Sequence, residues 1–309
     1  MAPLKLLYRD VDRTPFLYTL KYAAHERGVE LDVALQPGRD YGEFLQRDEV
    51  DLLAENYYNL QTFGARGVPM VSLATSVTWL NEKLLVAPDV GSFDDLRGKR
   101  FALRGQGPQE LINRLWLKDM GLHDAVEPVV ISEQAVGRWG QWKKVVSGDA
   151  AGTFVAHLYA DDALAAGLKE LPFEPYGFIG NVTLTTSRNI LAAKREAMEQ
   201  VVRAAFDAAR IFKTDRARTL SIMSGEPAAL IGAERDLQIE RMYEILAEEL
   251  SDAPVPSAQG ILNTYRMVLA RSPEIAGYNP LLMWDLSLAS RIVEEQKVSA
   301  SLASTRGGT

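Results

Sequence analysis

Cysteine is absent from the 309-residue chain, so disulfides, thiol nucleophiles and sites built on cysteine thiolates are excluded. Histidine is scarce, with three residues, and no two of them stand at a metal-binding spacing. The carboxylates do not follow the pattern of a calcium loop either. We therefore expect neither a metal nor a cofactor.

An excess of positive charge and a long apolar run are also missing. Lys and Arg number 34 against 41 Asp and Glu, a formal charge of −7 that argues against a nucleic-acid-binding surface. No apolar run approaches the ~18 residues of a membrane span. No secretory leader precedes the first strand-like segment, residues 4–8. We expect a cytoplasmic protein if Met1 is native, and a periplasmic or extracellular one if a signal peptide was removed.

The pattern along the chain indicates an α/β protein. Short apolar segments alternate with amphipathic helical segments through the first half, as in a wound α/β sheet. From Arg188 onward the pattern is strongly helical. The mixed charges of residues 234–249 predict a helix with a solvated face.

The first expected strand covers residues 4–8, and the polar loop that follows it is the first candidate site. This loop ends at the start of a helix, where Thr14 is the expected N-cap and Pro15 the first helical residue. Loops at the carboxyl ends of strands bind ligands in open α/β sheets. Arg13 can fork onto a carboxylate while Asp12 orients it or takes a proton. The alternative is a capping loop with surface ion pairs. The candidates are Asp10, Asp12, Arg13 and Thr14.

A second candidate cluster, Glu55, Asn56 and Tyr57, follows the apolar strand at residues 50–54. A lone carboxylate there can act as a general base with a raised pKa, and a tyrosine ring can stack on an aromatic ligand. The alternative is that Glu55 pairs with an arginine and the tyrosines pack. Both interpretations remain open.

The loop at residues 105–109 is a third candidate site, because it also joins the end of an expected strand to the start of an expected helix. It lacks the third glycine of a dinucleotide loop and the Gly-Lys-Ser/Thr of a P-loop, so a generic ligand-facing helix start is expected. Gly107 and Gln109 are its candidate residues. His157 follows another strand, residues 153–156, where a structural histidine is the alternative to a functional one.

Four segments, taken in their order along the chain, resemble segments of the type II periplasmic solute-binding fold. The resemblance is closest to the nitrate/sulfonate/taurine-binding and thiamine-pyrimidine-synthase-like superfamily. The segment Phe-Asp-Asp-Leu-Arg-Gly-Lys-Arg looks like that family's entry to its second lobe, and Val-Asp-Leu-Leu looks like one of its strands. Ser-Gly-Asp-Ala-Ala departs from the family's usual apolar-Asp pair at its last two positions. The segments are residues 93–100, 50–53, 147–151 and 181–187.

The resemblance implies two α/β lobes that enclose a ligand in a cleft. The first lobe would comprise residues 1–86 and 184–309, and the second residues 87–183. A small organic anion, aromatic or not, or a sulfonate is the implied ligand, with an ABC transporter as partner if the protein is exported. The loops then placed at the cleft hold the ligand-binding candidates Asp10, Asp12, Arg13, Thr14, Glu55, Asn56, Tyr57, Ser76, Gly107, Gln109, Gln134 and His157.

A second resemblance leaves an enzymatic function open. Residues 10–14, Asp-Val-Asp-Arg-Thr, are similar to a loop of 4,5-dihydroxyphthalate decarboxylases, and residues 51–55 to a strand that ends in Glu in those enzymes. If the chain is an enzyme, the resemblance implies a metal-free decarboxylase or lyase acting on an aromatic or heteroaromatic acid. Asp12, Glu55 and His157 would then handle the proton. We favour the binding function.

Overall fold

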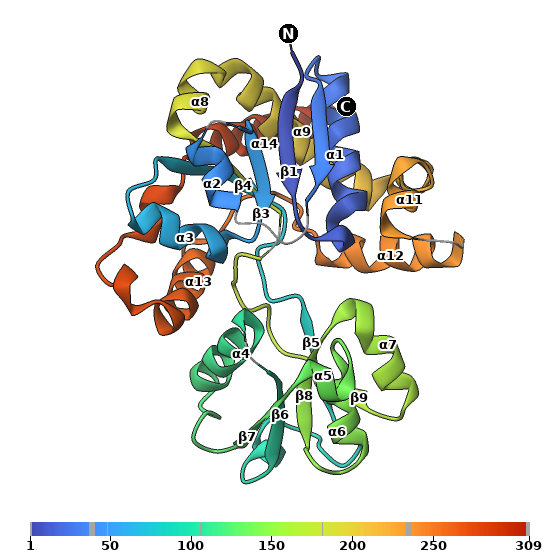
Figure 1. Ribbon diagram of the computed structural model, residues 1–309. Helices are drawn as coiled ribbons and strands as arrows, with labels where there is room; N and C mark the ends of the chain where they lie inside the picture. The colour runs from blue at the N-terminus through green and yellow to red at the C-terminus, as the bar shows by residue number, and fades with distance from the viewer. Residues whose placement is uncertain are drawn as a thin grey trace. The chain divides into compact units, whose positions relative to one another are not determined.

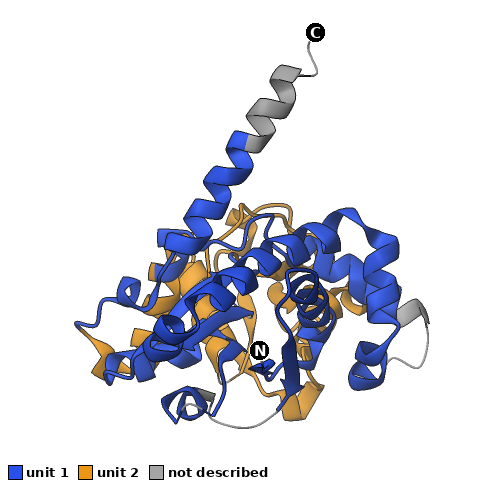
Figure 2. Ribbon diagram, turned by 90° about the horizontal axis from the view of Figure 1, so that it is seen from above, with its two compact units in different colours: residues 1–78, 179–261, 277–309 blue, residues 79–178, 262–276 orange. Residues whose placement is uncertain are grey.

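The protein divides into two compact units, and each is built on its own sheet. The structure, a computed structural model, describes residues 2–36, 41–47, 49–105, 107–180, 182–232 and 236–306. Gln106 and Asn181, which belong to the segments discussed above, lie outside the described residues. Unit 1 takes in residues 1–78, 179–261 and 277–309, and unit 2 residues 79–178 and 262–276 (Figure 2).

Unit 1 contains a five-stranded sheet in the order β2-β1-β3-β10-β4 (Figure 1). Strand β1 is parallel to β2 and β3, whereas β10 is antiparallel to both β3 and β4. Strands β1, β2, β3 and β4 therefore end at the same edge. The strands of unit 1 are β1 (Leu4–Tyr8), β2 (Leu31–Leu35), β3 (Leu52–Glu55), β4 (Met70–Thr75) and β10 (Thr183–Ser187).

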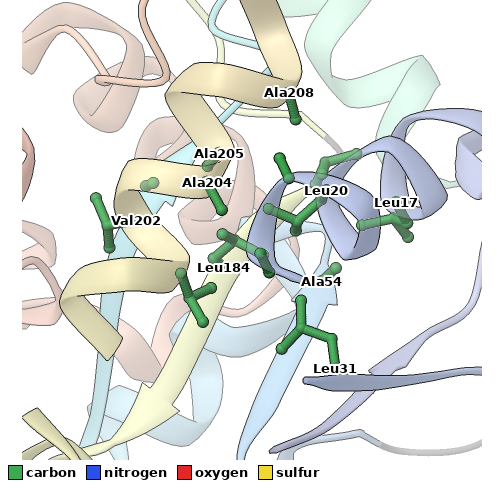
Figure 3. Packing of buried hydrophobic residues seen from close by; sticks show 14 of the residues in the cluster. Leu17, Leu20, Leu31, Ala54, Leu184, Val202, Ala204, Ala205 and Ala208 are labelled. Carbon is green, nitrogen blue, oxygen red and sulfur yellow. The ribbon is translucent and has the colours of Figure 1, made fainter. Parts of the chain in front are cut away.

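Helices α1 (Thr14–Glu26) and α9 (Arg195–Thr214) pack together in the main core of unit 1. Leu17 and Leu20 of α1 lie beside the alanines of α9 above Leu184 and Ala54 of the sheet (Figure 3). Small side chains on one helix let the backbone of a neighbouring helix approach closely. The buried alanines of α9 that recur at helical spacing are Ala204, Ala205, Ala208 and Ala209.

A second core of unit 1 forms from residues that alternate with the first along the strands. Leu6 and Leu52 belong to the main core, whereas their neighbours Leu7 and Leu53 belong to the second. The sheet is thus apolar on both faces, as expected for a wound α/β sheet. The other helices of unit 1 are α2 (Tyr41–Gln46), α3 (Tyr57–Ala65), α8 (Arg188–Ala193), α10 (Arg216–Met223), α11 (Glu226–Ile231), α12 (Asp236–Glu249) and α14 (Ser287–Arg306).

Unit 2 repeats the plan with strand order β7-β6-β8-β5-β9. Strand β6 is parallel to β7 and β8, and β5 is antiparallel to β8. The buried Trp116 ring meets the rings of Phe93, Phe154 and Phe173 edge-on. The elements are β5 (Glu82–Val86), β6 (Arg100–Arg104), α4 (Pro108–Asp119), β7 (Glu127–Ile131), α5 (Glu133–Val136), α6 (Lys143–Val146), β8 (Gly152–Ala156), α7 (His157–Ala165) and β9 (Lys169–Glu170).

The predicted α/β class with a helical C-terminal part is confirmed, while several boundaries differ. Residues 79–86 lie in unit 2, because β5 pairs with β8 and β9. Residues 179–183 lie in unit 1, and residues 262–276, which include most of α13 (Ala258–Arg271), lie in unit 2. The expected N-cap is also shifted: Arg13 is the N-cap of α1, and Thr14 is its first residue.

Candidate functional site

The carboxyl ends of β1 and β3 form the strongest candidate site of unit 1. The chain passes from β1 to β2 on one side and returns to β3 on the other, so the loops after β1 and β3 leave the sheet in opposite directions. Ligands of open α/β sheets bind where the strand order reverses in this way. We call this region the β1–β3 edge; its residues are Arg9, Asp10, Asp12, Arg13, Glu55, Asn56 and Glu249.

Glu55 ends β3, and its side chain is buried, with 2% of the residue exposed. Its Oε1 accepts hydrogen bonds from the Asn56 backbone N at 2.8 Å and from Asn59 Nδ2 at 3.0 Å. Its Oε2 is buried without a hydrogen-bond partner; Arg9 Nε lies 3.7 Å away. Burial raises the pKa of Glu55, and the positive charge of Arg9 opposes that shift in part.

Asn56, 5% exposed, connects the loop after β3 to the loop after β1. Its Nδ2 donates to Asp10 Oδ2 at 3.2 Å. A carboxylate oxygen accepts hydrogen bonds, so the amide nitrogen must face Asp10 and the amide oxygen must face away. That oxygen, Oδ1, is buried and has no hydrogen-bond partner.

Arg13 is buried against a carboxylate that comes from a helix far along the chain. It is 9% exposed, and its Nη1 donates to Oε2 of Glu249, the last residue of α12. The guanidinium of Arg13 is therefore already neutralised, which weakens the predicted anion clamp. Its Nε is buried and has no partner. The expectation that residues 234–249 form a solvated face is wrong at Glu249, which is 3% exposed.

Thr14 and Tyr57 serve packing in the structure. Thr14 is fully buried, and its hydroxyl shares a 2.8 Å hydrogen bond with the Tyr8 hydroxyl. Tyr57 is fully buried in the second core; its hydroxyl donates to the Pro280 carbonyl oxygen at 2.9 Å, and its ring centroid lies 5.0 Å from that of Trp284. Neither side chain presents a surface to a ligand.

Ser76 follows β4 and is buried near the same edge of the sheet. Its backbone N donates to the Val182 carbonyl at 3.2 Å, and its carbonyl accepts from the Ser251 backbone N at 2.8 Å. Asp12 lies in the short 3-10 turn Val11–Arg13 that precedes α1. These two predicted residues are thus placed in unit 1 next to the strand ends.

Unit 2 has its own polar strand ends, and the most buried charged group there is Glu82. It begins β5 opposite Ala156, which ends β8, and it is 6% exposed. Asn113 Nδ2 of α4 donates to Glu82 Oε2 at 2.8 Å. Burial raises the pKa of Glu82 to about 8, although the charge of Arg104 opposes the shift. A carboxyl with that pKa holds its proton at neutral pH.

Arg104, the last residue of β6, is held by two neighbours. Its Nε donates to Glu133 Oε1 at 2.7 Å, and its guanidinium lies 4.2 Å from the ring centroid of Trp139. Trp139 has a positive φ of 56°, a strained conformation for a bulky residue. Such strain concentrates at functional sites, which adds weight to this end of the sheet.

The remaining predicted residues lie at or beside the strand ends of unit 2. Gly107 is the N-cap of α4, with a φ of 154°, and Gln109 lies in the first turn of that helix. Gln134 lies in α5, where its backbone N donates to Ser132 Oγ at 3.3 Å. His157 is the half-buried first residue of α7, directly after β8.

Gly105, in the loop between β6 and α4, is required to be glycine by its close approach to β7. Its N donates to the Ile131 carbonyl at 2.7 Å. A Cβ at this position would lie 2.8 Å from that oxygen, so only glycine fits beside β7.

The described residues contain neither a metal-ligand group nor a membrane-spanning helix. No group of His, Cys, Asp or Glu there is arranged to hold a metal ion. None of the helices in that part of the chain is long and apolar enough to span a membrane.

Sequence reasoning missed four charged residues of these edges: Arg9, Glu82, Arg104 and Glu249. Glu82 begins β5, and a charge at the start of an apolar run was the available signal. Arg9 directly precedes the candidate residues of the loop after β1, which begin at Asp10. The role of Glu249 has no local signal, because its partner is 236 residues away.

The fold is similar to those of several solved structures. The chain has a TM-score of 0.69 and 14% identity to a putative periplasmic sulfonate-binding protein SsuA from Methylobacillus flagellatus, covering 96% of this chain and 95% of that one. The periplasmic aliphatic sulphonate binding protein SsuA from Escherichia coli gives 0.62 and 14%, covering 88% of each chain. The alkanesulfonate-binding protein SsuA from Xanthomonas axonopodis pv. citri, bound to MOPS, gives 0.54 and 16%, covering 91% and 96%.

These similarities extend over nearly the whole chain and confirm the predicted type II periplasmic-binding-protein-like fold. No curated protein sequence matches the chain significantly. The family model described as NMT1/THI5 like matches residues 22–215, which is more than half of the chain. The chain therefore belongs to the NMT1/THI5-like family.

Proposed function

We propose that the protein binds a small solute, an organic acid or sulfonate, and releases it unchanged. The fold is shared with proteins described as sulfonate-binding, and this supports binding rather than chemistry. A binding protein needs prearranged polar groups at strand ends. The described residues contain several buried polar groups there.

The observation that carries the proposal is unused hydrogen-bonding capacity at the β1–β3 edge. Glu55 Oε2, Asn56 Oδ1 and Arg13 Nε are buried and have no hydrogen-bond partner. Buried polar atoms in folded proteins nearly always have partners, and each unpaired one costs roughly 1–3 kcal/mol. Asn56 Oδ1 and Arg13 Nε, beside a Glu55 Oε2 that has only the ion pair with Arg9 at 3.7 Å, are best explained by a ligand that supplies the partners.

The proposed contacts follow from position at the strand ends. In unit 1 they are the strand-end residues that are not used for packing, so Thr14 and Tyr57 are left out. The proposed contacts in unit 1 are Asp10, Asp12, Arg13, Glu55, Asn56 and Ser76. In unit 2, Gly107, Gln109, Gln134 and His157 stay predictions.

An ABC importer is the proposed partner, since proteins of this fold include one described as the ligand-binding component of an ABC-type import system. Delivery to an importer requires a periplasmic or extracellular location. Fractionation of the native host, with an antibody against this chain, tests that location. Protein confined to the cytoplasm would contradict the transport role and would leave binding as a sensing or carrying function.

A thermal-shift screen of the purified protein against aromatic and aliphatic carboxylates and sulfonates tests the proposed function. Binding to the folded state raises the melting temperature by mass action. We expect at least one acid to raise it and to be recovered unchanged by mass spectrometry after incubation. An acid that loses the mass of carbon dioxide would instead make the protein a decarboxylase.

A further inference from the structure

The second core of unit 1 contains polar atoms that its own side chains do not satisfy. Among the described residues, Gln61 in the middle of α3 is fully buried, and neither its amide oxygen Oε1 nor its amide nitrogen Nε2 has a hydrogen-bond partner. The indole nitrogen Nε1 of Trp284, which packs against the same core, is also buried without a partner. These atoms belong to a packed core rather than to strand ends, so the ligand proposed for the β1–β3 edge does not account for them.

Tyr57 brings the two side chains together. Gln61 follows Tyr57 by four residues, so both lie on one face of α3. The ring centroids of Tyr57 and Trp284 are 5.0 Å apart. Burial raises the pKa of the Tyr57 hydroxyl, whereas the N–H groups of Trp284 and Gln61 oppose that rise. The Gln61 amide and the Trp284 indole therefore both lie beside this hydroxyl.

The Tyr57 hydroxyl does not supply all the missing partners. It donates its hydrogen to the Pro280 carbonyl oxygen at 2.9 Å, so it has no hydrogen left for Gln61 Oε1. A hydroxyl has only one hydrogen to donate, and an amide oxygen is an acceptor that needs a donor. The cluster therefore lacks one group that donates to Gln61 Oε1 and accepts from Trp284 Nε1.

Close packing limits the size of that group. Gly64 follows Gln61 by about one turn of α3, and a Cβ on Gly64 would lie 2.6 Å from Tyr278 Oη and 2.9 Å from Met283 Sδ. Residues 278–284 are thus pressed against this face of α3. A molecule between them must be small, and water is small and both donates and accepts hydrogen bonds. Buried waters typically make about three hydrogen bonds to polar groups that are otherwise unsatisfied.

We propose that α3 and residues 280–284 enclose a site for an internal water molecule, which accepts a hydrogen bond from Trp284 Nε1 and donates one to Gln61 Oε1. The oxygen of the neighbouring Tyr57 hydroxyl is available as a third partner. The water links α3 to the chain segment that follows α13, and α3 begins directly after Asn56. The site thus fixes the helix that leaves the β1–β3 edge, and it does so without a ligand at that edge.

A high-resolution crystal structure of the wild-type protein tests the site directly. We expect electron density for a water within hydrogen-bond distance of both Trp284 Nε1 and Gln61 Oε1. A core in which no such density lies between these two atoms would overturn the inference, whether they pair with protein groups or with nothing. Neither result bears on solute binding, so the proposed function succeeds or fails separately.

Gln61→Met tests the contribution of the water in solution, because methionine keeps the length of the side chain and removes the amide. The variant should lose the water and leave Trp284 Nε1 unpaired, so its melting temperature should fall by about 2 °C or more. If no water satisfies the amide in the wild type, removing the amide removes an unpaired polar group. A melting temperature that is unchanged or raised would therefore contradict the inference.

Gln46→Met is the matched control, since Gln46 is the exposed last residue of α2 in the same unit. It makes the same chemical change at a position where water is freely available to the amide. We expect the control to keep the wild-type melting temperature. An equal fall in both variants would show that the effect comes from methionine itself and would also overturn the inference.

Discussion

Buried ionisable side chains at strand and helix ends are stabilised in three different ways in this protein. Arg13 and Glu249 neutralise each other. Glu55 accepts two hydrogen bonds on one oxygen and lies near Arg9 on the other. Glu82 has a raised pKa and one hydrogen bond from Asn113. Each arrangement predicts a different response to substitution or to pH.

Replacing Arg13 by Met should destabilise the protein strongly. The substitution keeps much of the side-chain volume but leaves the buried Glu249 carboxylate without its partner. Loss of one member of a buried ion pair typically costs about 3–5 kcal/mol. We expect that loss in the free energy of unfolding measured by urea denaturation.

The double variant Arg13→Met/Glu249→Leu should recover most of the stability, because no unpaired buried charge remains. Arg47→Gln, which breaks an exposed pair with Glu43, is the control and should cost no more than about 1 kcal/mol. An Arg13→Met variant as stable as this control would show that the pair is not buried in solution.

The raised pKa of Glu82 predicts that the wild-type protein becomes less stable as the pH rises toward 8. Between the unfolded pKa of ~4.3 and the folded value of about 8, the folded state holds a proton that the unfolded chain has released. Stability then falls by at most roughly 1.4 kcal/mol per pH unit, is constant above this range, and is unaffected below it.

Glu82→Gln removes this titration while keeping an oxygen that can accept from Asn113. The difference in unfolding free energy between variant and wild type should therefore grow in favour of the variant from pH 5 to pH 8. Urea denaturation at several pH values measures it. Stability curves that stay parallel across this range would contradict the raised pKa.

Residue identity alone did not predict these partnerships. Arg13 was expected to bind a carboxylate, and it does bind one, but from Glu249 of the same chain. The expected alternative of Glu55 pairing with an arginine also has support in Arg9, 3.7 Å away. Long-range pairs of this kind depend on tertiary packing, which one sequence without its fold does not specify.

At the scale of elements, hydrophobic patterning was sufficient where the pattern was local. The strand expected at residues 4–8 is β1, and Pro15 is the second residue of α1, one position later in the helix than expected. The pattern was insufficient at unit boundaries. Strand β5 pairs with β8 and β9, which follow it by more than 60 residues, so nothing within residues 79–86 assigns them to unit 2.

The loop between β6 and α4 provides a prediction at this scale. Gly105→Ala places a methyl group 2.8 Å from the Ile131 carbonyl oxygen and 3.0 Å from Val130 Cγ1. Such overpacking typically costs about 1–3 kcal/mol. Thermal and urea denaturation should both show this loss of stability.

Gly91→Ala is the matched control in the same unit. Its added methyl group would meet only Asp95 Oδ2, at 3.5 Å, which is ordinary van der Waals contact. We expect a change within about 0.5 kcal/mol. Equal effects of the two substitutions would show that the close approach of residue 105 to β7 does not matter.

At the scale of the whole molecule, the chain forms each unit from segments that are distant in sequence. Residues 262–276 join unit 2 through Arg266, whose guanidinium donates to both oxygens of Asp119 at 2.7 and 2.8 Å. Tyr176 donates to the same carboxylate at 2.6 Å. The sequence indicated two units and their class, but not this late return of the chain.

The central claim is that the β1–β3 edge binds an organic acid. The most direct measurement is the affinity of the strongest acid from the thermal-shift screen for the wild type, for Asn56→Leu and for the control Glu43→Gln, by isothermal titration calorimetry. Asn56→Leu removes the unpaired Oδ1 and the link to Asp10. We predict that Asn56→Leu lowers the affinity for the acid by about tenfold or more, whereas Glu43→Gln leaves that affinity unchanged. A folded Asn56→Leu variant that binds the acid as tightly as the wild type would contradict the claim.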